Sequence, residues 1–68
     1  MKTATFAARL LAAREKRGLT QAELGKLARL DDSAISHFEG GRRQPNMANL
    51  KALADALECT TDYLCGVD

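Results

Sequence analysis

Side chains that could bind a metal ion or act as a nucleophile are few in this sequence and lie far apart. Cys59 and Cys65 are six residues apart, and the one histidine, His37, lies well upstream of both. The spacings typical of zinc sites, Cys-x-x-Cys and His-Glu-x-x-His, are absent. Catalysis also needs acids, bases or ligands clustered in one pocket, and no such cluster is visible. We therefore expect two reduced thiols, no metal or other cofactor, and no enzymatic activity.

The basic side chains could bind phosphate, and they are distributed unevenly. Residues 1–43 hold nine Lys and Arg against five Asp and Glu, whereas residues 44–68 hold Lys51 against four acids. The net charge of +1 therefore hides +4 in the first part of the chain and −3 in the second. This asymmetry indicates one face directed toward a polyanion and another kept away from it.

The length and composition indicate one small folded domain over residues 1–68. The 68 residues are 46% hydrophobic and 28% charged, which is typical of a folded domain rather than a disordered tail. Arg9, Arg14 and Lys16 interrupt the most apolar stretch, so we expect no membrane span. Residues 1–8 lack the long apolar region of a signal peptide, and we expect a cytoplasmic protein.

The elements that must position these groups are helices, because apolar residues recur three and four positions apart along nearly the whole chain. Phe6, Leu10 and Ala13 form one stripe, and Gly18 follows a basic last turn, which predicts a first helix over about residues 5–17. Thr20 and Glu23 have the spacing of a capping box and begin a second helix over about 21–28. Its apolar residues are Ala22, Leu24, Leu27 and Ala28.

A third helix is predicted after a short turn. Asp31 is the expected N-cap of a helix over about 32–39, in which Ile35 and Phe38 turn inward. Glycines at 40 and 41 end this helix, since glycine adopts the left-handed conformation cheaply. The other side carries Asp32, Ser33, Ser36 and His37. Gly25, in the second helix, allows another helix to approach closely. Two helices joined in this way form a helix-turn-helix, whose second helix can enter a DNA major groove about 12 Å wide.

Two further helices complete an all-α fold without strands or internal repeats. Asn46 is the expected N-cap of a helix over about 47–57, and a short helix over about 61–65 follows. The apolar stripe of the longer helix is Leu50, Leu53, Ala54 and Leu57. From the short helix we expect Tyr63 and Leu64 to return to the core.

From about Phe6 to Leu64 the sequence resembles the Cro and phage-repressor (Xre-like) helix-turn-helix family. The matching residues are Arg9-Leu10, Arg14, Gly18-Leu19-Thr20-Gln21-Ala22-Glu23-Leu24, Ile35-Ser36, Glu39, Gly41, Pro45, Leu50, Leu53-Ala54, Ala56-Leu57 and Asp62-Tyr63-Leu64. The resemblance implies a compact five-helix, lambda-repressor-like DNA-binding domain. It further implies a transcription regulator, in particular a repressor, that binds an inverted-repeat operator in double-stranded DNA as a homodimer, without a small-molecule ligand.

The resemblance also implies roles for individual residues. The base-reading positions are Asp32, Ser33, Ser36 and His37, of which Ser33 and His37 are the strongest candidates. The phosphate-binding positions are Gln21, Gly40, Gly41, Arg42 and Arg43. The dimer contact falls on Glu58, Cys59, Thr61 and Leu64. For the two serines, His37 and the two arginines, the alternative of a merely solvated surface position stays open.

Two further positions have a structural role by the same resemblance. Arg14 and Glu39 are expected to form a partly buried ion pair that ties the first helix to the end of the third. Arg9, Lys16 and Arg17 are expected on a solvated face.

The sequence departs from the family pattern at two kinds of position. Arg29 and Glu58 stand where the family often has glycine, so we expect strained or altered turns there. Asp31 and Asp32 place acids where phosphate approaches; Asp32 could accept a hydrogen bond from cytosine N4 or reject wrong sites. The second hypothesis is therefore a protein-interaction module on the same fold, antitoxin-like or an adaptor, with little DNA binding.

Overall fold

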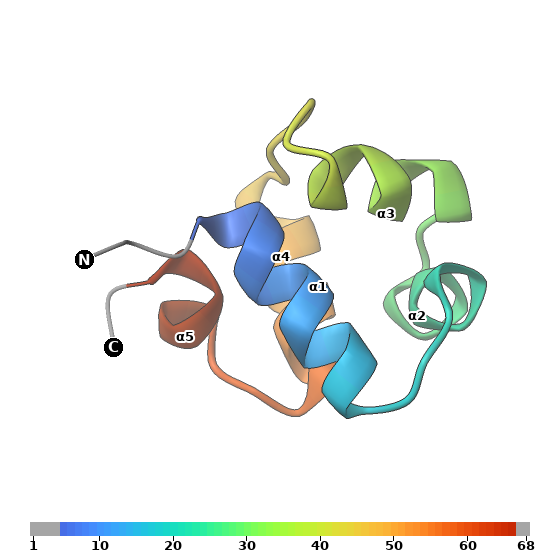
Figure 1. The fold of residues 1–68 in the computed structure, drawn as a ribbon, viewed down its shortest axis with the longest axis horizontal. Coiled ribbons are helices and arrows are strands. Elements are labelled where there is room, and N and C mark those ends of the chain that lie inside the picture. Colours follow the sequence, from blue (N-terminus) through green and yellow to red (C-terminus); the bar gives the residue numbers. More distant parts are fainter. Residues whose placement is uncertain (1–4, 67–68) are drawn as a thin grey trace.

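The computed structural model describes residues 5–66 and folds them into five helices (Figure 1). They are α1 (Phe6–Lys16), α2 (Gln21–Ala28), α3 (Asp32–Glu39), α4 (Met47–Leu57) and α5 (Thr61–Cys65). The last four have the predicted bounds, and α1 is one residue shorter at each end because Thr5 and Arg17 cap it. Residues 5–66 contain no strand. The described residues leave out Lys2 and Asp68, which were included in the charge count. They also leave out residues 1–4, the first half of the segment that was compared with a signal peptide.

Each helix begins at a side chain that accepts a hydrogen bond from the backbone N–H three residues later. These N-caps are Thr5, Thr20, Asp31, Asn46 and Thr60. At α2 the capping box is complete: Thr20 Oγ1 accepts from the Glu23 N–H at 3.0 Å, and Glu23 Oε1 accepts from the Thr20 N–H at 2.8 Å. An N-cap contributes about 1 kcal/mol. Local sequence therefore fixes where helices too short to be stable alone must begin.

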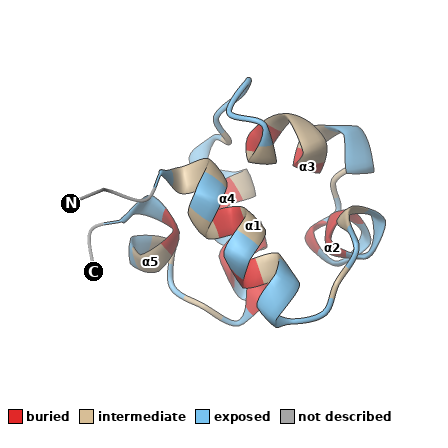
Figure 2. Cartoon of the chain, in the orientation of Figure 1, coloured by how far each residue is buried: buried red, intermediate tan, exposed pale blue. Residues whose placement is uncertain are grey.

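The core lies where the five helices meet, and the buried positions of Figure 2 turn toward this centre. Each helix contributes one large side chain that is fully buried: Leu10, Leu24, Ile35, Leu53 and Leu64. Helix α2 packs against α3 and α4, while α1 packs against α3 and α5. Burying a side chain of this size stabilises the fold by about 1.5–3 kcal/mol. The position of α3 thus depends on the whole core.

Two apolar residues of α2 lie outside the core, and Leu64 lies inside it. Ala22 and Leu27 are exposed, Leu27 by 56%, because the inward stripe of the eight-residue α2 is Leu24, Gly25 and Ala28. Leu64 was expected both in the core and at a dimer contact, and it is 0% exposed. Its side chain fills the core and cannot reach a partner, so its place in the dimer contact was wrong.

Gly25 lets the turn between α2 and α3 fold closely over α2. A Cβ atom at this position would lie 2.5 Å from the carbonyl oxygen of Leu30, whose N–H donates to the Gly25 carbonyl at 2.7 Å. Any other residue would push this backbone away. The close approach expected at Gly25 is therefore present, and it is the turn leading into α3 that makes it.

Arg29 and Glu58 take the left-handed conformation at the ends of α2 and α4, with φ of 62° and 57°. This conformation costs a non-glycine residue about 1–2 kcal/mol. The backbone strain expected at these two positions, where the sequence departs from the family pattern, is therefore present.

Replacing Arg29 with glycine is expected to raise the free energy of unfolding by about 0.5–1 kcal/mol. Glycine removes the steric cost of the left-handed conformation but gains freedom in the unfolded chain, which offsets part of the benefit. Urea denaturation measures the change. The matched control is Lys26→Gly at an exposed helical position of α2, which should lower stability by about 1 kcal/mol. A loss of stability in both variants would contradict the argument.

Candidate nucleic-acid interface

Helix α3 lies at one edge of the molecule, with α1 and α2 packed against its inner side (Figure 1). Ile35 and Phe38 face the core and are 0% and 3% exposed. The outer side carries the four predicted base-reading residues: Asp32 and Ser33 are exposed, and Ser36 and His37 are half-buried. The structure therefore brings these four residues together on the outer side of one helix, where Ser36 and His37 are partly covered and His37 Nδ1 is buried without a hydrogen-bond partner in the described chain.

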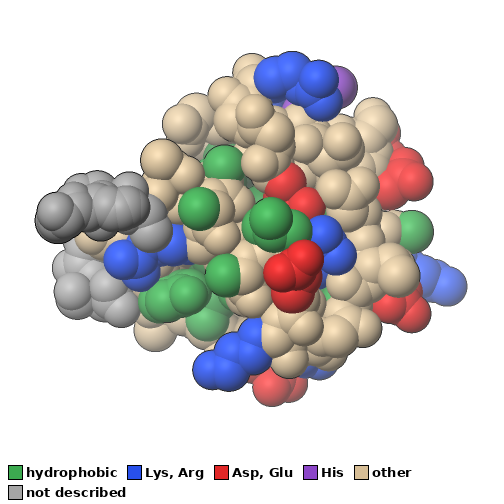
Figure 3. Space-filling model, viewed as in Figure 1, with side chains coloured by type: hydrophobic (Ala, Val, Ile, Leu, Met, Phe, Trp, Pro, Cys, Tyr) green, Lys and Arg blue, Asp and Glu red, His purple; other side chains and the backbone are tan. Residues whose placement is uncertain are grey.

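The segment that follows α3 is basic and projects from the fold. Gly40 ends the helix, and Gly41 takes φ of +74°, which reverses the chain direction. Arg42 and Arg43 are exposed, and within residues 5–66 neither forms an ion pair. Figure 3 shows Lys and Arg side chains at this tip of the molecule, next to the histidine surface. Positive charge thus lies at the end of the polar face of α3.

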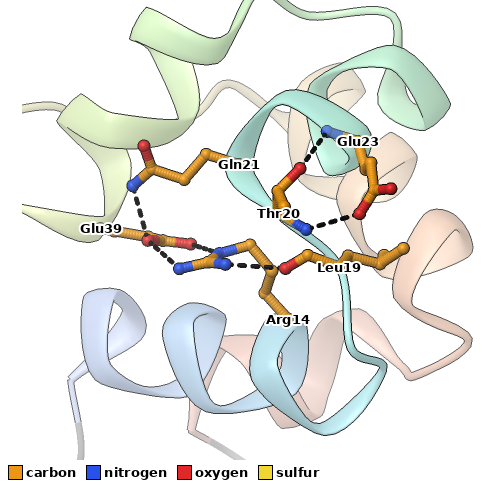
Figure 4. Close-up of polar contacts among 6 residues, drawn as sticks. All are labelled: Arg14, Leu19, Thr20, Gln21, Glu23 and Glu39. Carbon is orange, nitrogen blue, oxygen red and sulfur yellow. Dashed lines mark hydrogen bonds and ion pairs between the residues drawn. The ribbon is translucent and has the colours of Figure 1, made fainter.

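Gln21 is the first residue of α2, and its side chain reaches the end of α3. The side-chain amide donates to Glu39 Oε1 at 3.0 Å, a contact that the sequence did not reveal (Figure 4). The amide nitrogen carries a second hydrogen that can donate elsewhere. The backbone N–H groups at the start of a helix also lack acceptors within the helix. Gln21 therefore joins the two helices and keeps donors for an anion.

The carboxylate of Glu39 is held mainly by Arg14. Arg14 Nε lies 2.6 Å from Glu39 Oε2, and Arg14 Nη2 donates to Oε1 at 3.1 Å, so the pair is bidentate. Arg14 Nη1 donates to the Leu19 carbonyl at 2.8 Å. The two side chains are 14% and 7% exposed. This expected ion pair ties α1, the following turn and the end of α3 into one network (Figure 4).

The hydrogen bond to Glu39 raises the pKa of the Arg14 guanidinium above its usual value, although burial of the side chain acts in the opposite direction. A basic group with a raised pKa contributes its stability fully below the pKa of the unfolded chain. Loss of the Arg14 proton therefore removes this contribution only above the usual arginine range.

Lys16 and Arg17 are exposed, as expected of a solvated face, whereas Arg9 is half-buried, and both arginines make specific contacts. Arg9 Nη1 donates to the Tyr63 carbonyl at 3.0 Å, and its guanidinium carbon lies 5.0 Å from the centre of the Tyr63 ring. Arg17 Nη1 donates to the Ala56 carbonyl at 2.9 Å and lies 3.4 Å from an exposed carboxylate oxygen of Glu58. These contacts hold α5 and the end of α4 against α1. They join residues 54 and 39 positions apart, and no local spacing signals them.

The remaining predicted dimer residues lie at the α4–α5 connection. Glu58 is exposed, and Cys59 and Thr61 are half-buried. Two shallow hollows of about 400 and 480 Å³ meet at Cys59, one lined by Leu57 and Tyr63 and the other by Thr61. Burial raises the pKa of the Cys59 thiol, so it stays protonated and unreactive near neutral pH.

Two other features bear on the kind of site. Among residues 5–66, no three His, Cys, Asp or Glu side chains are grouped so as to hold a metal ion. No helix in the same range is long and apolar enough to span a membrane.

Comparison with known protein families shows which family has this arrangement of helices. A helix-turn-helix family model matches residues 10–64. The chain belongs to the helix-turn-helix family. The family resemblance drawn from the sequence is confirmed, and α2 and α3 are the two helices of the helix-turn-helix unit.

Curated relatives of this helix-turn-helix chain are named as transcriptional regulators. It is 42% identical over 64 residues to "Repressor protein C2" of Salmonella phage P22, covering 94% of this chain and 30% of that protein. It is 35% identical over 60 residues to "HTH-type transcriptional regulator ImmR" of Bacillus subtilis (strain 168), covering 88% of this chain and 47% of that protein. The chain therefore spans less than half the length of either relative.

Solved structures confirm the fold of this helix-turn-helix domain. The P22 c2 repressor in complex with a synthetic operator has a TM-score of 0.92 and 41% identity, covering 97% of this chain and 100% of that one. The restriction-modification controller protein C.AhdI from Aeromonas hydrophila has a TM-score of 0.85 and 34% identity, covering 90% and 92%. The predicted five-helix repressor-like fold is confirmed.

Arg14→Ala is expected to lower the free energy of unfolding by about 3 kcal/mol, because it leaves a buried carboxylate without its cation. Arg17→Ala removes an exposed ion pair and one hydrogen bond and should lower it by about 1 kcal/mol. Thermal denaturation of the two variants compares them directly. Equal melting temperatures would show that the Arg14–Glu39 pair does not hold α3.

Proposed function

We propose that this chain is the DNA-binding unit of a transcription regulator, in particular a repressor, which binds an inverted-repeat operator as a homodimer with α3 in the major groove. The observation that carries this proposal is the polar outer face of α3, followed directly by a basic loop without ion pairs among the described residues. Such a regulator acts by occupying its site and needs no catalytic group or cofactor. We expect it to act in the cytoplasm.

The face of α3 offers chemically different groups to the base edges. The hydroxyls of Ser33 and Ser36 can donate or accept, and His37 can donate to guanine N7 or O6. Asp32 can accept from the N4 amine of cytosine and disfavours other contacts. Ser33 and His37, four residues apart on one face, would bind neighbouring positions of the site. This set supports recognition of sequence rather than of backbone alone.

Donors at both ends of the face can bind the phosphate backbone. At the start of α2, Gln21 offers a side-chain amide hydrogen together with the free amides and positive dipole of the helix N-terminus. The loop of Gly40, Gly41, Arg42 and Arg43 supplies backbone amides and guanidinium groups. Because Glu39 holds Gln21 at 3.0 Å, the first group keeps a fixed position relative to α3.

The two acids at the start of α3 do not have the same role. Asp31 accepts a hydrogen bond from the Ala34 N–H at 2.9 Å and caps the helix, so its charge has a structural reason. Asp32 makes no such bond within the described chain and is free to meet a base. The acidic start of α3 is therefore compatible with DNA binding and does not by itself favour a protein partner.

A second copy is needed because one short helix makes too few contacts for useful specificity. We assign the dimer contact to Glu58, Cys59 and Thr61, at the α4–α5 connection, with half-sites about 34 Å apart. The acids of the second half of the chain support a surface that faces away from phosphate.

Selection from random duplexes should enrich an inverted repeat, and binding to it should weaken steeply with salt, since phosphate contacts release counterions. Arg43→Ala should reduce the slope of log Kd against log salt by about one. Lys51→Ala, an exposed cation on α4, is the matched control and should leave the slope unchanged. Absent or salt-insensitive binding would favour the protein-interaction module instead.

Thr61→Arg should weaken dimer formation and operator binding together, because a two-fold contact would bring the two added charges close to each other. Sedimentation equilibrium and titration with a full operator measure the two effects. Ala12→Arg, which adds the same side chain at an exposed site of α1, is the control. An unchanged dimer in Thr61→Arg would place the contact elsewhere.

A further inference from the structure

The guanidinium of Arg42 lies against the last turn of α3. The position that a Cβ atom would take at Gly40 is 3.7 Å from both Nε and Nη2 of Arg42 and 3.2 Å from the Ser36 carbonyl oxygen. The three atoms nearest to that position include two of Arg42 and none of Arg43. The Arg42 N–H donates to the His37 carbonyl at 3.0 Å, and this hydrogen bond holds the chain where it reverses direction after α3. The two arginines, equivalent in the sequence, therefore occupy different places.

The place of the Arg42 guanidinium extends the polar face of α3. Gly40 follows Ser36 by four residues and His37 by three, so it belongs to the helix face that carries these side chains. Because Gly40 has no side chain, the guanidinium occupies the next position on this face. Asp32, Ser33, Ser36 and His37 supply a carboxylate, two hydroxyls and an imidazole. Arg42 adds the permanent cation that this set lacks.

We propose that Arg42 is a specificity-determining residue that donates to a guanine in the major groove, while Arg43 binds phosphate. The inference rests on the proposed function, and for Arg42 alone it replaces the phosphate role that the family resemblance implies and that the proposed function assigns to this loop. Guanine presents two acceptors, N7 and O6, in the major groove, and the parallel N–H groups of a guanidinium match them. Within residues 5–66 no ion pair occupies these donors. Their position on the face of α3 directs them to the base edges that this face meets.

The test compares selection from random duplexes by the wild-type chain, Arg42→Ala and Arg43→Ala. Alanine removes the guanidinium donors, so Arg42→Ala should lose the preference for one guanine in each half-site. Arg43→Ala is the matched control, which also loses one cation but should return the wild-type site. Both positions lie in an exposed loop, and unchanged melting temperatures confirm that the fold is intact.

A second measurement identifies the contacted atom. In the selected site the guanine is replaced by 7-deazaguanine, which lacks the N7 acceptor. The wild-type chain should lose about 5- to 150-fold in affinity, and Arg42→Ala should lose nothing further. If Arg42→Ala selects the wild-type site, or if the deaza substitution weakens both proteins equally, Arg42 does not read guanine. If the wild-type chain enriches no site at all, the proposed function itself fails.

Discussion

The ion pair of Arg14 and Glu39 joins parts of the chain that local sequence leaves independent. One guanidinium binds the carboxylate at the end of α3 and the Leu19 carbonyl in the turn before α2. The same carboxylate accepts from Gln21 at the start of α2. Three elements therefore share one buried charge, and the direction of α3 relative to the N-terminus of α2 is set by hydrogen-bond geometry. Apolar packing alone is not directional and would allow α3 to rotate or slide.

A buried ion pair adds little to the net free energy of unfolding, since the cost of removing both charges from water offsets much of their attraction. In this fold its value lies in orientation. The core already takes a fully buried side chain from every helix, including Leu24 and Ile35 of the helix-turn-helix unit. Gly25 then sets how closely the turn lies on α2, and the Arg14–Glu39 pair sets the far end of α3. Helix α3 is consequently held at both of its ends.

The sequence was a good guide wherever the signal is local. All five helix starts have a capping side chain, and glycines or left-handed residues follow the helix ends, so the bounds could be predicted to within one residue. The Arg14–Glu39 pair came from the family resemblance, since no local spacing joins these residues. The contacts of Gln21 with Glu39 and of Arg9 with Tyr63 had no sequence signal at all. Leu64 was correctly expected in the core, whereas the apolar spacing of the short second helix did not show that Leu27 lies outside it.

The one fully buried large side chain that each of the five helices supplies has a consequence for how the domain unfolds. Helix α5 packs mainly on α1 and α4 and places Leu64 in the core, so loss of this last turn would open a void against those two helices. A single domain of this size is expected to unfold in one cooperative transition. A protease that cuts the unfolded chain would then find its segments accessible together, and the outer face of α3 would be lost in the same step as the rest.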